Sequence, residues 1–209
     1  MDRKQLSRTA KEFIAEVAYG FREVATHSLV PPWEVSYLFI NDLRRIETSP
    51  EDFREDSVLF TLEMASDVDY RELKKYWDKL SIEERKEAIH KIIQAMAALG
   101  LMAAVGSIAI NTRPSQKEEI LRIASEYDKG EITYKEMVSD IEDVLWPTRE
   151  ERAKYWKDIE EYEKVMALAD YLPAEAIKRI IRAYFIDMIR LQMFDTYFVV
   201  PSVYPNLLE

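Results

Sequence analysis

Apolar and polar residues follow one another along this chain with the period of an α-helix almost throughout. Apolar side chains such as Phe13, Val17 and Phe21 recur at steps of three and four residues, with charged residues between them. This spacing places the apolar residues on one face of a helix. It predicts nine helices, near residues 3–28, 32–47, 50–65, 69–79, 82–110, 115–128, 134–146, 149–170 and 173–198. We therefore expect an all-α fold of one globular domain over residues 1–200, followed by a C-terminal tail at 201–209.

Local signals mark the start of several predicted helices. A Ser or Thr followed three residues later by an acid forms a capping box, in which each side chain binds the backbone N–H of the other residue. This pattern occurs at Ser49, Ser81, Ser115, Thr133 and Thr148. The chain contains only four glycines, which leaves few positions for hairpin turns or phosphate-binding loops.

The longest apolar segment, Ile92–Ile110, has no charged residue and lies within predicted helix 82–110. A helix that is apolar on all sides must be covered by other helices or by lipid. The segment is nearly long enough to cross a bilayer, but many of its residues are Ala or Gly rather than the larger apolar residues that favour insertion. Neighbouring helices carry apolar faces that need a partner; in 32–47 this face is Val35, Leu38, Phe39, Leu43 and Ile46. We therefore expect 82–110 to be the buried centre of a soluble fold, with a membrane span as the alternative.

The last predicted helix, 173–198, is apolar on more than one face and continues into an apolar tail. A core helix with a docked tail would explain this pattern. A surface that a second chain covers would also explain it, because large apolar patches often mark interfaces. This second explanation predicts a homo-oligomer or a protein partner, with contacts made by Tyr184, Phe185, Met188, Phe194, Tyr197 and Phe198.

Composition favours a folded protein in water. Of the 209 residues, 48% are hydrophobic and 33% are charged, as in globular domains. The formal net charge of −10 opposes general binding to nucleic acid and to anionic lipid, so no membrane partner is expected. The absence of cysteine excludes disulfides, thiolate zinc sites and a cysteine nucleophile. Few amides and many Glu and Lys match the composition of heat-adapted proteins. An N-terminal segment without an apolar signal region predicts a cytoplasmic location.

One helix of the predicted set carries a pair of metal-ligand residues. Glu87 and His90 lie three residues apart, so both project from one helix face. Di-iron helical bundles use two such pairs and two further carboxylates. The only other histidine is His27, so the second pair is absent. The alternative is a polar pair on the surface of the helix.

Two basic stripes contrast with the acidic chain. They consist of Arg3, Lys4 and Arg8 near the start, and Lys178, Arg179 and Arg182 in the last helix. If the two helices were neighbours, the stripes would form one positive patch suited to phosphate or nucleic acid. They would otherwise be the outer faces of two helices, paired with acidic neighbours.

From these patterns we expect a non-enzymatic helical interaction or assembly module that self-associates through its apolar last helix. The first alternative is an apolar-ligand-binding or metal-using helical enzyme, because the small residues of 92–110 leave room between helices. The second is a nucleic-acid binder that uses the basic stripes. No catalytic residue and no cofactor is predicted, because the sequence lacks a nucleophile elbow, a phosphate loop and a zinc-hydrolase motif.

Overall fold

The chain is built almost entirely from α-helices. The computed structural model describes residues 5–48, 55–155 and 159–193, and these residues are 83% helical and contain no strand. The helices are α1 (Arg8–Thr26), α2 (Pro32–Thr48), α3 (Glu55–Ser66), α4 (Tyr70–Trp77), α5 (Ile82–Ile110), α6 (Pro114–Asp128), α7 (Tyr134–Leu145), α8 (Arg149–Tyr155), α9 (Ile159–Ala169), α10 (Ala174–Ile181) and α11 (Asp187–Met193), with a π-helical turn η1 (Arg182–Ile186) between the last two. The predicted all-α fold is confirmed.

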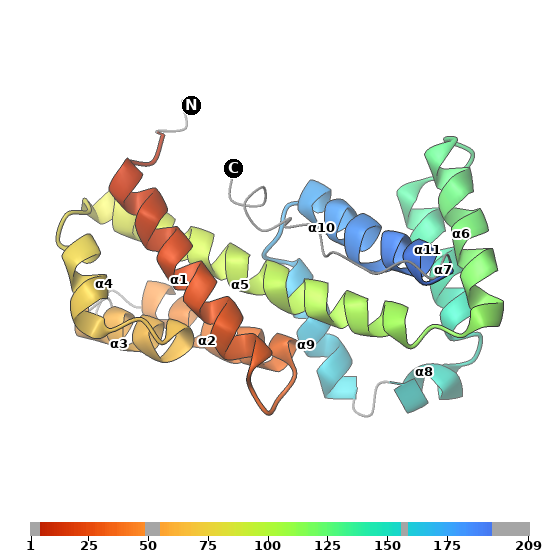
Figure 1. The fold of residues 1–209 in the computed structure, drawn as a ribbon, viewed down its shortest axis with the longest axis horizontal. Helices are drawn as coiled ribbons and strands as arrows, with labels where there is room; N and C mark the ends of the chain where they lie inside the picture. The colour runs from red at the N-terminus through yellow and green to blue at the C-terminus, as the bar shows by residue number, and fades with distance from the viewer. Residues whose placement is uncertain (1–4, 49–54, 156–158, 194–209) are drawn as a thin grey trace.

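Helix α5 runs along the middle of the molecule, and α1, α2, α9, α10, η1 and α11 pack along it (Figure 1). It begins at a predicted capping box, where the Glu84 backbone N–H donates to Ser81 Oγ at 3.2 Å and the Ser81 N–H donates to the Glu84 carboxylate at 3.1 Å. The helix is long and apolar enough to cross a membrane, yet 72% of its most apolar 18-residue stretch is buried in the fold. Neighbouring helices cover it, as in the core helix of a soluble protein.

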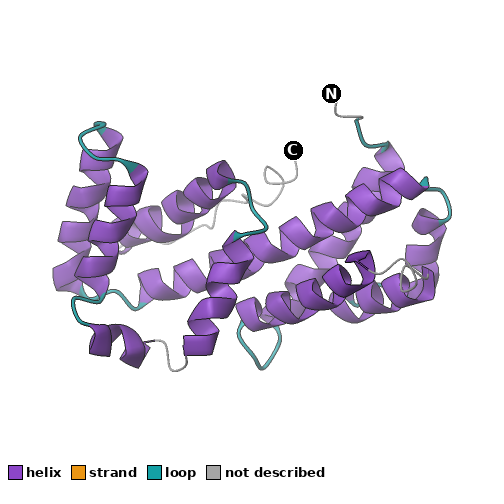
Figure 2. Ribbon diagram, turned by 180° about the vertical axis from the view of Figure 1, so that it is seen from behind, coloured by secondary structure: helices purple, strands orange, loops and turns teal. Residues whose placement is uncertain are grey.

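Two hydrophobic clusters lie along α5. The larger one includes Phe13, Trp77 and Met96 and is formed where α1, α2 and α9 pack on α5 and where α3 and α4 pack on α1. The smaller one includes Ile120 and Phe185 and is formed where α6 and α7 meet the last helix and the end of α5. Figures 1 and 2 show α3 and α4 near one end of α5, and α6 and α7 at the other. Because α5 contributes to both clusters, it joins the two groups of helices into one fold.

Two helix starts differ from the sequence prediction because other residues stand at the N-cap. Helix α1 begins at Arg8 rather than near residue 3, since Ser7 caps it and Ser7 Oγ accepts the Ala10 backbone N–H at 3.2 Å. Helix α6 begins at Pro114, one residue before the predicted start. Proline suits the first turn of a helix, where a backbone N–H would have no helical partner. The capping box predicted at Ser115 does not form, since Ser115 lies within α6 and the Arg113 backbone N–H donates to Gln116 Oε1 at 3.1 Å.

The capping box at Thr133 also forms, and at Thr148 the threonine half of the box is present. In each, the backbone N–H three residues later donates to the threonine hydroxyl, at 3.3 and 3.1 Å. The segment 149–170, predicted as one helix, contains the separate helices α8 and α9 on either side of residues 156–158, which lie outside the described residues. With α10, η1 and α11 taken as one continuous helix, the described chain has ten helices where nine were expected.

Small residues let α2 and α5 cross closely. Ser36 is fully buried, and its hydroxyl donates to the Met96 carbonyl oxygen at 2.8 Å. A Cβ on Gly100 would lie 2.7 Å from Ser36 Oγ, so glycine is needed there. Leu38, which the periodicity placed on the buried face, is instead 58% exposed. Two residues correspond to about 200° around a helix, so burial of Ser36 turns Leu38 outward.

Candidate functional site

The apolar residues of the last helix pack mainly inside the chain. Phe185 is only 4% exposed and belongs to the smaller hydrophobic cluster, so it is not available to a second copy. Met188 is half-buried, and its Sδ lies 3.7 Å from the place that a Cβ on Gly106 would occupy. Tyr184 is also half-buried, and burial raises the pKa of its hydroxyl.

Three residues of the predicted interface, Phe194, Tyr197 and Phe198, lie outside the described residues, as does the tail at 201–209. Within α10, η1 and α11, Met193 is the only large hydrophobic side chain that is clearly exposed, at 42%. The interface at the last helix therefore stays a prediction, and the described half of it offers less apolar surface than the sequence suggested.

The predicted metal pair lies on the surface of α5. Glu87 and His90 are both exposed. Among residues 5–48, 55–155 and 159–193, no three His, Asp or Glu side chains gather closely enough to hold a metal ion. The structure thus supplies no additional ligands for this pair, although His90 does line the groove described below.

Three residues of the basic stripes are paired with acids, and the described parts of the two stripes are separated in space. Arg8 Nε lies 2.8 Å from Glu12, Lys178 Nζ lies 2.9 Å from Glu175, and Arg182 Nη1 lies 2.6 Å from Asp128. The hydrogen bond with Asp128 raises the pKa of the Arg182 guanidinium. Arg3 and Lys4 lie outside the described residues, and Arg179 is on α10. Figure 1 shows the start of α1 far from α10 along the long axis of the molecule, so Arg8 and the α10 stripe do not form one patch.

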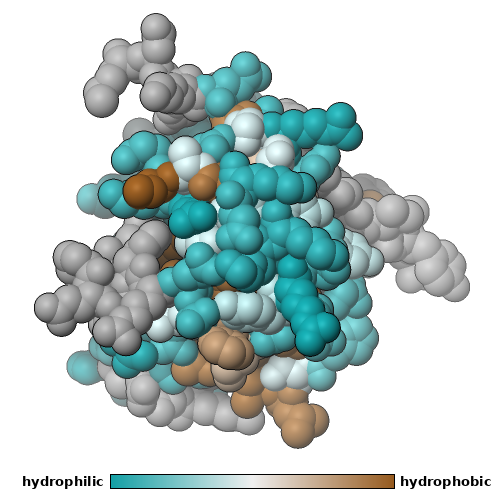
Figure 3. Space-filling view, turned by 90° about the vertical axis from the view of Figure 1, so that its left-hand side faces the viewer, coloured by the Kyte–Doolittle hydropathy of each residue, from teal (hydrophilic) through white to brown (hydrophobic). Residues whose placement is uncertain are grey.

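Three large apolar side chains that the sequence analysis did not expect on the surface are exposed on the neighbouring helices α2 and α3. We define the α2–α3 strip as Leu38, Phe60 and Met64, which are 58%, 54% and 71% exposed. Figure 3 looks at the end of the molecule that holds α3 and α4; this face is largely hydrophilic, with hydrophobic side chains gathered at its lower edge. The sequence of α3 already indicated that Phe60 and Met64 would be exposed, because they lie opposite the face that is buried. The opposite face of α3 already had four apolar residues, Val58, Leu59, Leu62 and Ala65, to bury.

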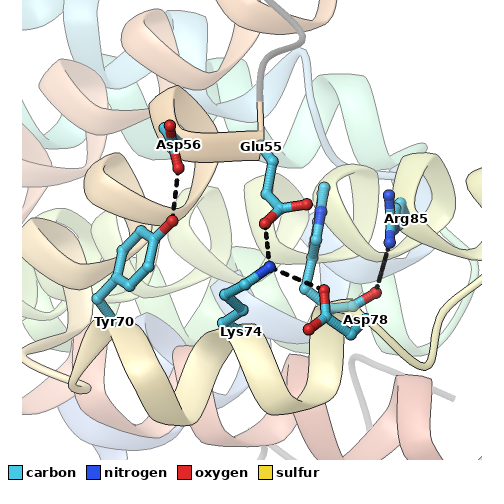
Figure 4. Close-up of polar contacts among 7 residues, drawn as sticks. Glu55, Asp56, Tyr70, Lys74, Asp78 and Arg85 are labelled. Carbon is cyan, nitrogen blue, oxygen red and sulfur yellow. Dashed lines mark hydrogen bonds and ion pairs between the residues drawn. The ribbon is translucent and has the colours of Figure 1, made fainter.

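Polar contacts join α3 to α4 beside Phe60 of this strip (Figure 4). The Tyr70 hydroxyl donates to Asp56 at 2.6 Å, and this hydrogen bond raises the pKa of the phenol. Lys74 lies between Glu55 and Asp78, and the hydrogen bond with Glu55 is the main reason that the pKa of its ammonium group is raised.

Aromatic and backbone contacts complete this junction. The ring of Tyr70 packs on Phe60 with 5.1 Å between ring centroids. The Arg85 guanidinium donates to the Trp77 carbonyl oxygen at 2.9 and 3.1 Å, which ties the end of α4 to α5. The contacts at this junction join α3, α4 and α5.

A groove opens between α2, α5 and the end of α9. We define the α2–α5–α9 groove by its lining residues, which are Tyr37, Asn41, Arg44, His90, Ile93, Ala167, Asp170 and Tyr171, and its volume is about 590 Å³. On one wall, Arg44 Nη1 donates to the Tyr171 hydroxyl at 2.9 Å, and the guanidinium lies 5.3 Å from the centroid of that ring. Sequence analysis picked out only His90 of this set, because the remaining residues meet only in the folded chain.

These features define an all-α protein with a buried central helix, an apolar strip on one face and a polar groove between three helices. No protein-family model matches the chain, and neither a curated protein nor a solved structure is significantly similar to it. Only the chemistry of its own surfaces therefore bears on its function.

Proposed function

We propose that this protein is a helical interaction module that self-associates through the α2–α3 strip. The observation that supports this most directly is the exposure of three large apolar side chains, Leu38, Phe60 and Met64, on two helices in mutual contact. Covering such side chains by a second protein removes apolar surface from water, and exposed apolar side chains grouped on one face often mark interfaces.

The arrangement of the two helices supports a continuous strip. The C-terminal half of α2 lies beside the N-terminal half of α3, because Arg45 and Ile46 line the same surface hollow as Ser57 and Thr61. The helices are therefore antiparallel, and the middle of α2, with Leu38, lies toward the same end as Met64. A two-fold axis across such a pair would set the strip of one copy against that of the other, which is the commonest symmetry of dimers.

Charge at the strip is compatible with contact between two copies of an acidic chain. The neighbouring polar residues include uncharged Ser57 and Thr61, and Arg45 lies 3.9 Å from Asp42 in an ion pair. Helix α3 carries Glu55, Asp56 and Glu63. Lys74 is paired with Glu55, which offsets part of the repulsion between two copies of this surface. The burial of α5 supports an aqueous setting for this assembly, and the expected cytoplasmic location stays part of the proposal.

Sedimentation equilibrium of the full chain, from micromolar to millimolar concentration, tests this function. We expect a reversible monomer–dimer equilibrium. Leu38→Lys and Met64→Lys should each weaken the dimer by about tenfold or more, because a charge would enter an apolar contact. Both side chains are more than half exposed, so the melting temperature of the monomer should change little.

The matched control is Met193→Lys, which makes the same change on the last helix. It should leave the dimer intact if the strip is the interface. Dissociation by Met193→Lys but not by Met64→Lys would place the interface at the last helix and contradict the proposal. A wild-type chain that stays monomeric over the whole range would also contradict it.

A further inference from the structure

We propose that the α2–α5–α9 groove binds a small organic anion, a single carboxylate carried on a flat apolar body. The groove combines a guanidinium, an imidazole, an amide and two phenols with apolar wall residues. Its volume of about 590 Å³ lies within the usual range of small-molecule sites, roughly 300–1,000 Å³. The site would be independent of self-association through the α2–α3 strip.

Arg44 would receive the carboxylate. Its hydrogen bond to the Tyr171 hydroxyl at 2.9 Å, and its position over the same ring, hold the guanidinium at the groove wall. A guanidinium can donate two parallel N–H groups to a carboxylate, which gives a stronger and more directional contact than a lysine would give. His90 reaches the groove from α5, and Asn41 lies about one helical turn before Arg44 on α2. Both provide further N–H donors for an anion.

The rest of the groove would hold the flat body of the ligand. Ile93 and Ala167 supply apolar wall surface, and the Tyr37 ring lies beside them. Lys164 Nζ lies 5.8 Å from the centroid of that ring and 3.1 Å from Glu34, so the ring is supported by an ion pair between α9 and α2. Planar aromatic surfaces favour flat ligands, which stack on or against them.

The lining also disfavours other ligands. A metal ion would find only His90 and Asp170 as good ligands in the groove, and Arg44 would repel it. A multiply charged phosphate chain would face the carboxylate of Asp170 as well as the net negative charge of the protein. Arg44 and Asp170 carry one charge of each sign. A ligand with a single carboxylate can therefore contact Arg44 with less repulsion from Asp170 than a multiply charged anion would meet.

Titration of the full chain, followed by the amide resonances of the groove residues, tests this proposal with three probes. Benzoate carries both the charge and the ring, acetate only the charge, and benzamide only the ring. We expect saturable shifts at the groove with benzoate, and binding at least about tenfold weaker for acetate and for benzamide, since each lacks one of the two contacts. Equal binding of benzoate and benzamide, or no saturable shift with any probe, would overturn the proposal.

Two variants and one control variant test whether benzoate binds in the α2–α5–α9 groove. Arg44→Gln should weaken benzoate binding by about tenfold, since a hydrogen-bonded charge pair is lost. Arg45→Gln removes the same charge from the next position of α2, outside the groove, and should bind as the wild type does. Equal loss in both variants would mean that bulk charge alone attracts benzoate, which would contradict the assigned site.

Ala167→Leu keeps every charge and fills the groove from α9. It should abolish benzoate binding while the melting temperature stays near that of the wild type. This variant tests the proposal even if Arg44→Gln proves unstable. Unchanged benzoate binding by Ala167→Leu would show that benzoate binds outside the groove and would contradict the proposal.

Discussion

At the crossing of α2 and α5, the hydroxyl of Ser36 is a fully buried polar group whose hydrogen bond is satisfied by the Met96 carbonyl oxygen. A serine here allows the two backbones to approach closely, because a larger side chain would meet Gly100. The same choice decides which side of α2 faces water, and it leaves Leu38 on the exposed strip. One small residue therefore determines both a core contact and a surface feature.

Substitution of Ser36 tests whether this residue is needed for the close crossing of α2 and α5. Ser36→Val should destabilise the fold by about 1–3 kcal/mol, because extra methyl groups would overpack the crossing and the hydrogen bond would be lost. Urea unfolding would measure the change in free energy. Ser57→Val, an identical change at an exposed position of α3, should stay within about 0.5 kcal/mol of the wild type. If the two variants were equally stable, the close crossing would not depend on Ser36.

At the scale of helices, two glycines that look alike in the sequence have different surroundings. Gly20 in α1 touches the end of α3, so that an added Cβ would lie 2.1 Å from the Ser66 carbonyl oxygen. Gly106 in α5 has room, because an added Cβ would meet Met188 Sδ at 3.7 Å. Periodicity cannot separate these cases, since both glycines lie inside predicted helices.

Alanine at each glycine should therefore have opposite effects. Gly20→Ala should destabilise the fold by about 3 kcal/mol, toward the upper end of overpacking costs, because the clash is with backbone. Gly106→Ala should be neutral or stabilising by up to about 1 kcal/mol, since alanine favours helix more than glycine does. Thermal and urea unfolding of the two variants would check this. Equal destabilisation of both would contradict the difference in packing at the two positions.

Across the whole molecule, carboxylates at helix ends and surfaces link stability to acid pH. The pKa of Glu84 is lowered mainly by the Ser7 hydroxyl, that of Glu119 by Arg122, and that of Glu136 by the Thr133 backbone N–H. Their ordinary pKa is 4.5. The folded state therefore binds these protons less tightly than the unfolded state, and the resulting stability is present above pH 4.5 and is lost as the pH falls below it.

We therefore expect the urea midpoint to decrease as the pH falls from neutral through the ordinary range of glutamate titration. Glu136→Gln should flatten part of this decrease, because glutamine does not titrate, and it should lower stability at neutral pH by weakening the capping box at the start of α7. A midpoint that is constant from neutral pH to well below the glutamate range would contradict these lowered pKa values.

Packing between distant segments explains why the candidate sites could be predicted only in part from the sequence. Phe185 was assigned to an interface because the last helix is apolar on several faces, but α6 and α7 turn back onto that helix and bury it. Arg44 and Tyr171 were overlooked because they are 127 residues apart in the chain and meet only where α9 returns to α2. Phe60 and Met64 could have been identified, since they lie opposite an apolar face that was already complete.

The sequence alone determined the helical class, the position of the central helix and several helix starts, because these depend on local periodicity and on capping residues within one turn. The tertiary structure decided which face of α2 is buried, which apolar residues of the last helix remain exposed, and which side chains line the groove. The physical reason is that periodicity shows which residues share a face of a helix, whereas only packing with distant segments shows what covers that face.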